Sequence, residues 1–282
     1  MKHLLSLFLL LPMLCVAQPD RTAASKLPSQ DELATINDSI LQEGLRLYTY
    51  EKLSWMASDL LAEHASVDLS SIRGSAAQLD GNSKLTHFYC RKDSVVFSCT
   101  LDLNDFSLSW DNTVRPMTED DKDAVHFRSE MINRIIETYG DSIYTIQDGS
   151  INIDLIWLST DKLRAYLLQG TTLNGVIPFG NDCYVDIDID GNLIEFHRFH
   201  HSYIPIDIRQ TGEDTHAVEV IHSHTVDNPF FTPTDICNAL LYARDLFEMK
   251  SVSVLSTAFD PPVIMTFNME DMSITVNELD HH

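Results

Sequence analysis

The sequence predicts a mixed α/β (α+β) fold, with helices plus an antiparallel meander in the N-terminal half and a mixed sheet flanked by helices in the C-terminal half. Helix-capping motifs open segments of helical apolar period in the first half of the chain. Short apolar or alternating runs, typical of strands, dominate from residue 141 onward. A single capped helical segment interrupts those runs, which indicates a mixed α/β arrangement there.

Residues 1–17 have the pattern of a secretory signal peptide. Lys2 precedes an apolar run from Leu4 to Val16, and the small residue Ala17 offers a cleavage point. The run is too short to span a bilayer, and no later segment is apolar enough to do so. A lipoprotein signal fits less well, because the residues before Cys15 are not small. We expect an exported protein, periplasmic or extracellular.

The chain is strongly acidic. It carries 19 Lys and Arg against 42 Asp and Glu, a formal charge of −23 at pH 7. Such a charge repels phosphate backbones and anionic lipid head groups, so we expect binding neither to nucleic acid nor to a membrane surface. The cysteines that follow the expected signal peptide are Cys90, Cys99, Cys183 and Cys237. They are too widely spaced for a disulfide scaffold, and their pairing stays open.

We assign residues 18–150 to an N-terminal α+β region without an assigned role. Ser29 to Glu32 is a capping box that opens a helix, and a second amphipathic segment follows at 55–61. Thr118 to Asp121 caps a further helix. Strands of an antiparallel meander are predicted at 85–90, 95–101 and 106–110.

Residues 151–282 form the second part, which is mostly strand. The pair Asp190-Gly191 indicates a type I′ hairpin turn. Asp186, Asp188 and Asp190 alternate with apolar residues, which favours a solvated strand face over a calcium loop. From about residue 141 onward, strands are predicted at 143–146, which still belongs to the N-terminal region, and at 151–158, 163–168, 183–189, 193–199, 217–224, 252–255, 263–267 and 274–276, with a helix from 233 to about 250.

The most informative stretch is His222-Ser-His224, followed after seven residues by Thr232-Pro-Thr-Asp235. Residues 219–224 are predicted as a strand, so the two imidazoles, two residues apart, point to the same face. With the carboxylate of Asp235 they make a set of two nitrogens and one oxygen that leaves zinc an open position for water. The spacing therefore predicts a catalytic-type zinc site with His222, His224 and Asp235 as the metal ligands.

This spacing resembles the signature of the JAB/MPN (JAMM) family of metal-dependent isopeptidases and peptidases, H-x-H-x7-S-x-x-D, in which the two His and the Asp hold zinc. Thr232 stands where the family has Ser, so the resemblance implies that it aids the tetrahedral intermediate. The resemblance covers only the C-terminal half. It implies an exported zinc-dependent hydrolase that cleaves a peptide or amide bond, with a peptide or protein as substrate or partner.

The chain departs from the family pattern at the general base. The family has a Glu three residues before a Gly, whereas Thr172 holds that place before Gly175, and no acid lies between Leu163 and Asn181. Glu195, in an expected hairpin, is the remaining carboxylate that could act as catalytic base. The missing Glu gives weight to an alternative, a non-catalytic JAB-like protein that binds a metal or a partner.

The same residues also have a purely structural interpretation. Thr232 as N-cap, Pro233 at the first helical position and Asp235 at the third form a variant capping box. This explains Asp235 without a metal, but it does not explain His222 and His224. The two interpretations are compatible, because a helix start near a strand end is a common place for a site.

A second histidine cluster comprises His197, His200 and His201. Its position at a polar strand end favours ordinary surface histidines. His200 or His201 could supply a ligand or a proton shuttle if the hairpin borders the site. Ser202 lacks the strand-turn-helix context of a nucleophile elbow, so the sequence gives no support for a serine hydrolase.

Overall fold

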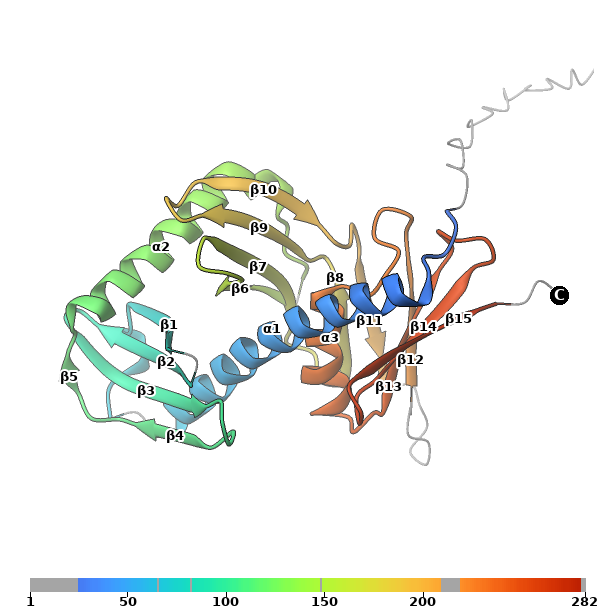
Figure 1. The fold of residues 1–282 in the computed structure, drawn as a ribbon. Coiled ribbons are helices and arrows are strands. Elements are labelled where there is room, and N and C mark those ends of the chain that lie inside the picture. Colours follow the sequence, from blue (N-terminus) through green and yellow to red (C-terminus); the bar gives the residue numbers. More distant parts are fainter. Residues whose placement is uncertain (1–24, 65, 82, 148, 209–218, 280–282) are drawn as a thin grey trace, which may run out of the picture.

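The structure is a computed structural model that describes residues 25–279 except 65, 82, 148 and 209–218, so the expected signal peptide lies outside the described residues. Within these residues, three α-helices and four sheets form the α+β fold that the sequence predicts (Figure 1). Most strand pairs are antiparallel, and the C-terminal sheet is mixed. No helix in the described part of the chain is long and apolar enough to cross a membrane.

Helix α1 (Gln30–His64) runs from the C-terminal sheet to the N-terminal sheet (Figure 1). It starts at the predicted capping box, where the backbone N–H and the hydroxyl of Ser29 donate to Glu32 Oε2 at 2.8 and 2.7 Å. The two helical segments predicted here are one continuous helix, which corrects the sequence prediction. The residues that join them, 49–54, contain neither glycine nor proline, so nothing interrupts the helix.

The N-terminal sheet has the order β1-β2-β3-β4, with β5 paired to β3, and every pair is antiparallel. The predicted meander corresponds to β2, β3 and β4. Strand β1 was not predicted, because most of its residues are small or polar and show no alternation of large apolar with polar side chains. Helix α2 begins at the predicted cap, with both capping-box bonds between Thr118 and Asp121 present. The elements are β1 (Gly74–Asp80), β2 (Lys84–Arg91), β3 (Ser94–Asp102), β4 (Leu108–Asp111), β5 (Arg115–Pro116), α2 (Glu119–Tyr139) and the 3₁₀ turns η1 (Leu69–Ser71) and η2 (Gly140–Ser142).

The middle sheet is antiparallel with the order β10-β9-β7-β6. Its hairpin turns at the predicted Asp190-Gly191 pair, but the prediction of a type I′ turn is wrong. That turn needs a positive φ at both residues, and of the two only Gly191 has one, at 79°. The prediction of a solvated acidic face is wrong at Asp186, which is 4% exposed and accepts two hydrogen bonds from Arg164. Its strands are β6 (Gly149–Trp157), β7 (Lys162–Thr171), β9 (Cys183–Asp188) and β10 (Leu193–Arg198).

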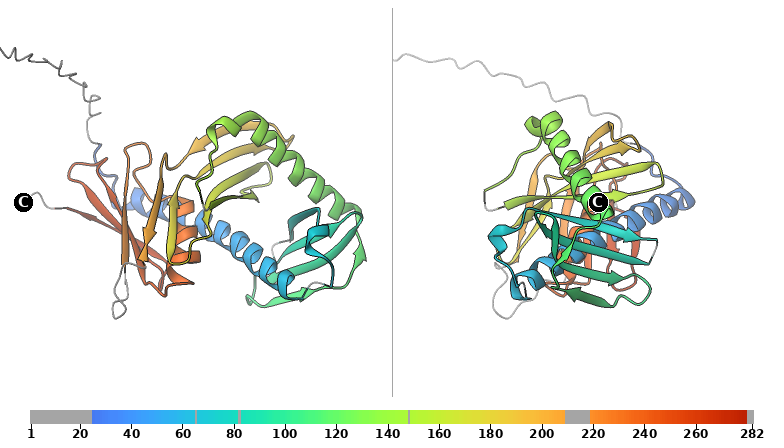
Figure 2. Two further views of the ribbon diagram at one scale, coloured as in Figure 1. Left: turned by 180° about the vertical axis from the view of Figure 1, so that it is seen from behind. Right: turned by 90° about the vertical axis from the view of Figure 1, so that its left-hand side faces the viewer.

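The prediction of a strand at 143–146 is wrong, since these residues form no strand. The carbonyl oxygen of Tyr144 accepts a hydrogen bond at 2.9 Å from the side chain of Asn181 rather than from a neighbouring strand. Strands β8 (Val176–Gly180) and β11 (Tyr203–Asp207) were not predicted, and they pair with each other as a separate two-stranded sheet. This pair lies between the middle sheet and the C-terminal sheet (Figure 2).

The C-terminal sheet has the order β12-β13-β14-β15, in which β12 and β13 are parallel and the other pairs antiparallel. A helical crossover joins the two parallel strands, as parallel pairing requires. It consists of α3 (Pro233–Asn238) and the π-helical segment η4 (Ala239–Arg244), so it ends earlier than the predicted residue 250. The strands are β12 (Glu219–His224), β13 (Ser251–Ser256), β14 (Val263–Asn268) and β15 (Ser273–Glu278).

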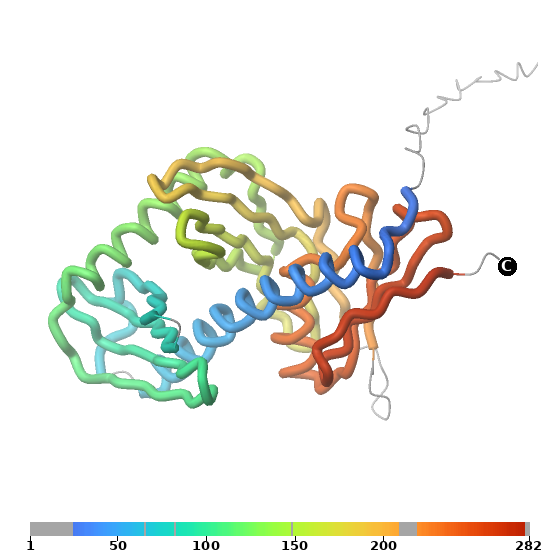
Figure 3. Tube along the Cα trace, in the orientation of Figure 1, coloured from blue at the N-terminus to red at the C-terminus, as the bar shows by residue number. Residues whose placement is uncertain are grey.

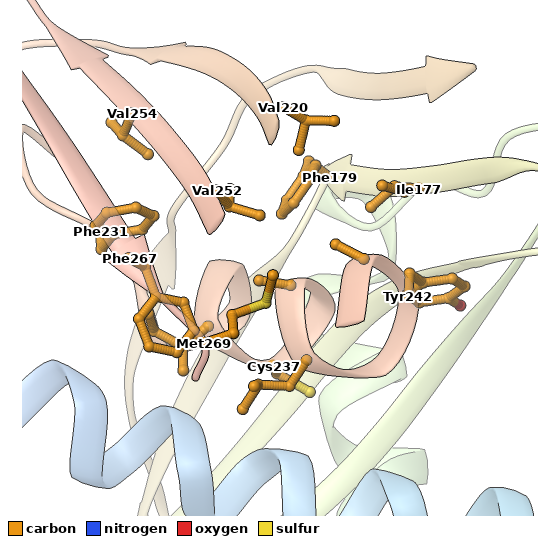
Figure 4. Close-up of a cluster of buried hydrophobic side chains, with 14 of the residues drawn as sticks. Ile177, Phe179, Val220, Phe231, Cys237, Tyr242, Val252, Val254, Phe267 and Met269 are labelled. Carbon is orange, nitrogen blue, oxygen red and sulfur yellow. The ribbon is translucent and has the colours of Figure 1, made fainter. Parts of the chain in front are cut away.

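The largest core packs α3 and η4 against the strands around them. Figure 4 shows Phe179 of β8 beside Val220 of β12, with Val252 of the sheet on the same side of the helix and Phe267 near the end of the helix. On its other side α3 contacts α1, where a Cβ on Gly44 would lie 2.5 Å from the Cβ of Ile236. Figure 3 shows that α1 begins beside these C-terminal elements and leads away from them. The four described cysteines are buried and free.

Candidate metal site

The end of β12 and the start of α3 bring the three predicted ligands together. Along β12 every second residue is buried, so His222 and His224 face the interior together. The Nε2 atoms of these two imidazoles lie 3.0 Å apart. Asp235 Oδ1 lies 3.1 Å from Nε2 of His222, and Asp235 Oδ2 lies 3.3 Å from Nε2 of His224.

His200 is a fourth member of this cluster. Its Nε2 lies 2.9 Å from Nε2 of His224 and 3.7 Å from Oδ1 of Asp235. The candidate ligand atoms of all four residues lie within 4.8 Å of one another, so the group could hold a metal ion. The interpretation of His200 as a surface residue is therefore wrong, because it is only 6% exposed.

The two other histidines of that stretch stay outside the cluster. His197 Nε2 contacts the side-chain oxygen of Asn228 at 3.0 Å, and His201 is exposed. The sequence analysis made a role for His200 conditional on the hairpin bordering the site. The end of the β10 hairpin does border it, and this distinguishes His200 from the two other histidines. The apolar Phe199, buried directly before it, marks the point where the chain turns inward.

Fixed hydrogen bonds determine which nitrogen of two imidazoles faces the cluster. His200 Nδ1 lies 2.7 Å from Asp182 Oδ1, and His224 Nδ1 lies 2.7 Å from the carbonyl oxygen of Phe230. Both oxygens only accept, so both Nδ1 atoms carry a proton and donate it. In a neutral imidazole this leaves Nε2 with a lone pair. The two Nε2 atoms and the Asp235 carboxylate converge, an arrangement that a cation between them would stabilise.

Asp235 is held by the capping box that the structural interpretation predicted. Thr232 donates its backbone N–H and its hydroxyl to Asp235 Oδ2, at 2.8 and 2.7 Å. The N–H of Asp235 donates back to Thr232 Oγ1 at 3.1 Å. Oδ1 of Asp235 is left facing His200 and His222. The helix cap and the cluster therefore use the same carboxylate, and Thr232 positions it.

On the side away from the cluster, His222 is held by packing rather than by a hydrogen bond. Its ring stacks on Phe179 of β8, with 4.6 Å between the ring centroids and an interplanar angle of 26°. Its Nδ1 is buried and has no hydrogen-bond partner among the described residues. Burial lowers the pKa of His222, which favours the neutral imidazole that binds metals.

The buried carboxylates set the charge of the site. Burial opposes a charged His200, but the carboxylates of Asp182 and Asp235 outweigh it and raise the pKa of His200 to about 9. Burial favours neutral Asp235, yet the three imidazoles hold its pKa well below the usual range. Asp235 is therefore a carboxylate in a buried site, which requires either a proton on an imidazole or a metal ion beside it.

The residues considered for the general base lie apart from the cluster. Glu195 is exposed on β10, and Thr172 is exposed between β7 and β8. The acid that sequence reasoning missed is Asp182, directly after the acid-free stretch that ends at Asn181. It is 1% exposed, and it accepts hydrogen bonds from His200 and from the hydroxyl of Thr234. No spacing in the sequence predicts that Asp182 lies beside His200, because this placement depends on how β8 pairs with β11.

In comparisons with known proteins, the chain matches no protein-family model, no curated protein and no solved structure.

Proposed function

We propose that this protein binds a divalent transition-metal ion, zinc in the first instance, through His200, His222, His224 and Asp235. One observation carries the proposal: the Nε2 atoms of His200 and His224 face the same point as the Asp235 carboxylate, and their Nδ1 atoms are fixed by proton acceptors. Neutral imidazole and carboxylate are preferred zinc ligands, and a hydrogen bond on the far nitrogen is the usual support for a metal-binding histidine.

The geometry best supports a structural role for the ion. Four protein ligands complete the tetrahedral coordination of a closed zinc site, whereas a catalytic site keeps one position open. The side chains of His222, His224 and Asp235 are at most 1% exposed, which leaves a substrate no surface to approach. We therefore propose a non-catalytic, JAB/MPN-like metal-binding protein, in which the ion joins β12, α3 and the segment after β10.

A zinc-dependent peptidase or amide hydrolase is the second candidate, because the His200–Asp182 pair points at the other three ligands. In this proposal His222, His224 and Asp235 would hold zinc, which would supply Lewis-acid chemistry. His200 would take the place of the missing Glu. In the unprotonated form that a bound cation favours, it would accept a proton from the attacking water, and Asp182 would stabilise the imidazolium. The substrate would be a peptide or protein met after export.

The metal content of the purified chain tests the first proposal. The protein is dialysed against zinc and then against metal-free buffer, and its zinc is measured by mass spectrometry. We expect about one ion per chain for the wild type and for His201→Ala, whose exposed imidazole is the matched control. His222→Ala and Asp235→Asn should lose most of it. A wild type that retains no zinc would contradict the proposal.

His200→Ala separates the two candidates. Removal of a structural ligand lowers zinc binding, whereas removal of a general base lowers hydrolysis. Zinc content and hydrolysis of a peptide and amide library are therefore measured together on the zinc-loaded chain. If His200 is a ligand, the variant binds zinc more weakly and the wild type hydrolyses nothing. If His200 is the base, the variant keeps its zinc and loses a hydrolytic activity that the wild type shows.

A further inference from the structure

A second feature of the molecule lies away from the metal cluster. A cavity of about 1030 Å³ is bounded by α1, by β1 and β2 of the N-terminal sheet, by α2 and by β6 of the middle sheet. In Figure 2, α2 runs from the N-terminal sheet to the middle sheet, and α1 runs from the N-terminal sheet towards the C-terminal sheet. None of the four cluster residues lines this cavity. Its volume suits a small-molecule ligand, because ligand pockets commonly enclose several hundred to about 1000 Å³.

Glu51, near the middle of α1, lines the cavity with a buried carboxyl group. It is only 2% exposed, and no described residue places a donor on its Oε1 with hydrogen-bond geometry, although Trp55 and Asp154 lie beside the carboxyl group. Asn152 donates to its Oε2 over a long 3.4 Å. A buried carboxyl oxygen without a donor is costly, and a ligand that donates to it would remove this cost.

Asp154 of β6 is a second carboxyl group beside Glu51. Burial, followed by the charge of Asp154, raises the pKa of Glu51 well above its usual range. Burial also raises the pKa of Asp154. Two neighbouring carboxyl groups cannot both ionise easily, so this pair retains a proton that a bound cation would displace.

The charges around this pair leave the wall acidic. The one basic side chain that is always charged in the lining is Arg128 of α2. Burial and the charge of Arg128 lower the pKa of His87 to about 4, so His87 is neutral, and its buried Nε2 has no partner among the described residues. The carboxyl groups of the lining belong to Glu51, Asp80, Asp120, Asp123 and Asp154.

Aromatic side chains complete the lining. Tyr50 and Trp55 of α1, Phe127 of α2 and Trp157 of β6 all contribute to the wall. Aromatic faces attract organic cations and also bury an apolar body. We propose that this cavity binds a small organic cation, an amine or guanidinium group on an apolar body, with Glu51 and Asp154 as its counter-ions. This proposal is independent of the metal site.

The first test compares a charged probe with a neutral probe of nearly the same shape. 2-Phenylethylamine and 2-phenylethanol are titrated into the full chain, and tryptophan fluorescence is followed, since Trp55 and Trp157 line the cavity. We expect saturable binding of the amine that is about tenfold or more tighter than binding of the alcohol, and weaker at high salt. Equal binding of the two probes, or no saturable binding of the amine, would overturn the proposal.

The second test removes the proposed counter-ions. Glu51→Gln and Asp154→Asn should each weaken amine binding about tenfold or more, because each keeps the side-chain shape and removes a carboxylate. Asp38→Asn, an exposed change on the same helix, is the matched control and should bind like the wild type. Far-ultraviolet circular dichroism checks that each variant is folded. Unchanged affinity in folded Glu51→Gln would overturn the assignment, and the comparison of the two probes on the wild type decides even if the variants do not fold.

Discussion

Three of the four cluster residues each have a fixed partner on the side away from the cluster. Asp182 holds His200, the Phe230 carbonyl holds His224, and Thr232 holds Asp235. Such partners fix the orientation of a ligand and raise its basicity. At the scale of single residues, the site therefore depends on groups outside the H-x-H-x7-T-x-x-D pattern as well as on those within it.

Asp182→Asn tests this dependence. The amide still accepts the proton of His200 Nδ1, but it lacks the negative charge, so zinc affinity should fall by about 10- to 100-fold while the chain stays folded. Competition with a chromophoric chelator measures the affinity, and Asp38→Asn serves as the control. Unchanged affinity in folded Asp182→Asn would show that Asp182 does not support the site.

The buried carboxyl group of Glu51 gives a pH-dependent stability. Its pKa in the folded chain lies above the usual value of 4.5, so above that pH the unfolded chain releases a proton that the folded chain keeps. Unfolding is then increasingly favoured as the pH rises towards the folded pKa. Compared with Glu51→Gln, the wild type should lose stability between about pH 5 and about pH 7.5. Urea unfolding at the two pH values measures this difference, and a constant difference would contradict it.

At the scale of elements, the close contact of α1 with α3 fixes where Asp235 lies. Gly44 allows this contact, because a Cβ there would also lie 3.0 Å from the carbonyl oxygen of Pro233. The turn of helix that Gly44 touches is the one that begins at the Thr232 cap. The position of α1 therefore affects the metal cluster, although α1 contributes no ligand.

Gly44→Ala should lower the free energy of unfolding by about 1 to 3 kcal/mol, because the added methyl group forces the two helices apart. Gly140→Ala is the matched control: its nearest neighbour would be 3.8 Å away, and the change should raise stability by less than about 1 kcal/mol. Urea unfolding of both variants measures the effect. Equal stability of Gly44→Ala and the wild type would mean that the contact adapts without cost.

The elements also show which parts of the site could be predicted from sequence. His222, His224 and Asp235 lie within one strand-loop-helix unit. The alternation along the strand and the capping box of the helix were therefore enough to predict that the three side chains lie together. His200 and Asp182 follow β10 and β8, and nothing local indicates that these two strand ends meet beside β12. Strands β8 and β11 were missed for the same reason, since their pairing joins segments far apart in the chain.

At the scale of the whole molecule, the cluster links three segments: the end of β10, the end of β12 and the start of α3. An ion that binds only the folded chain stabilises it by mass action. We therefore expect zinc at about 100 times its dissociation constant to add about 2.7 kcal/mol to the free energy of unfolding.

Thermal unfolding with zinc and with a chelator measures this increment. The wild type and His201→Ala should be stabilised alike, and His222→Ala should gain little, because it lacks one ligand. An equal zinc effect in His222→Ala would place the ion elsewhere in the molecule. The same experiment with 2-phenylethylamine reports on the separate cavity, which should respond equally in His222→Ala and the wild type.

X-ray absorption spectroscopy of the zinc-loaded chain tests the central claim most directly, because it reports the atoms around the ion. The four side chains predict a first shell of nitrogen and oxygen atoms at about 2.0 to 2.2 Å, with the outer-shell scattering of three imidazole rings. The four buried cysteines are free, so zinc bound to thiolate instead would give a shell near about 2.3 Å. Sulfur in that shell, or scattering from fewer than two imidazoles, would contradict the account.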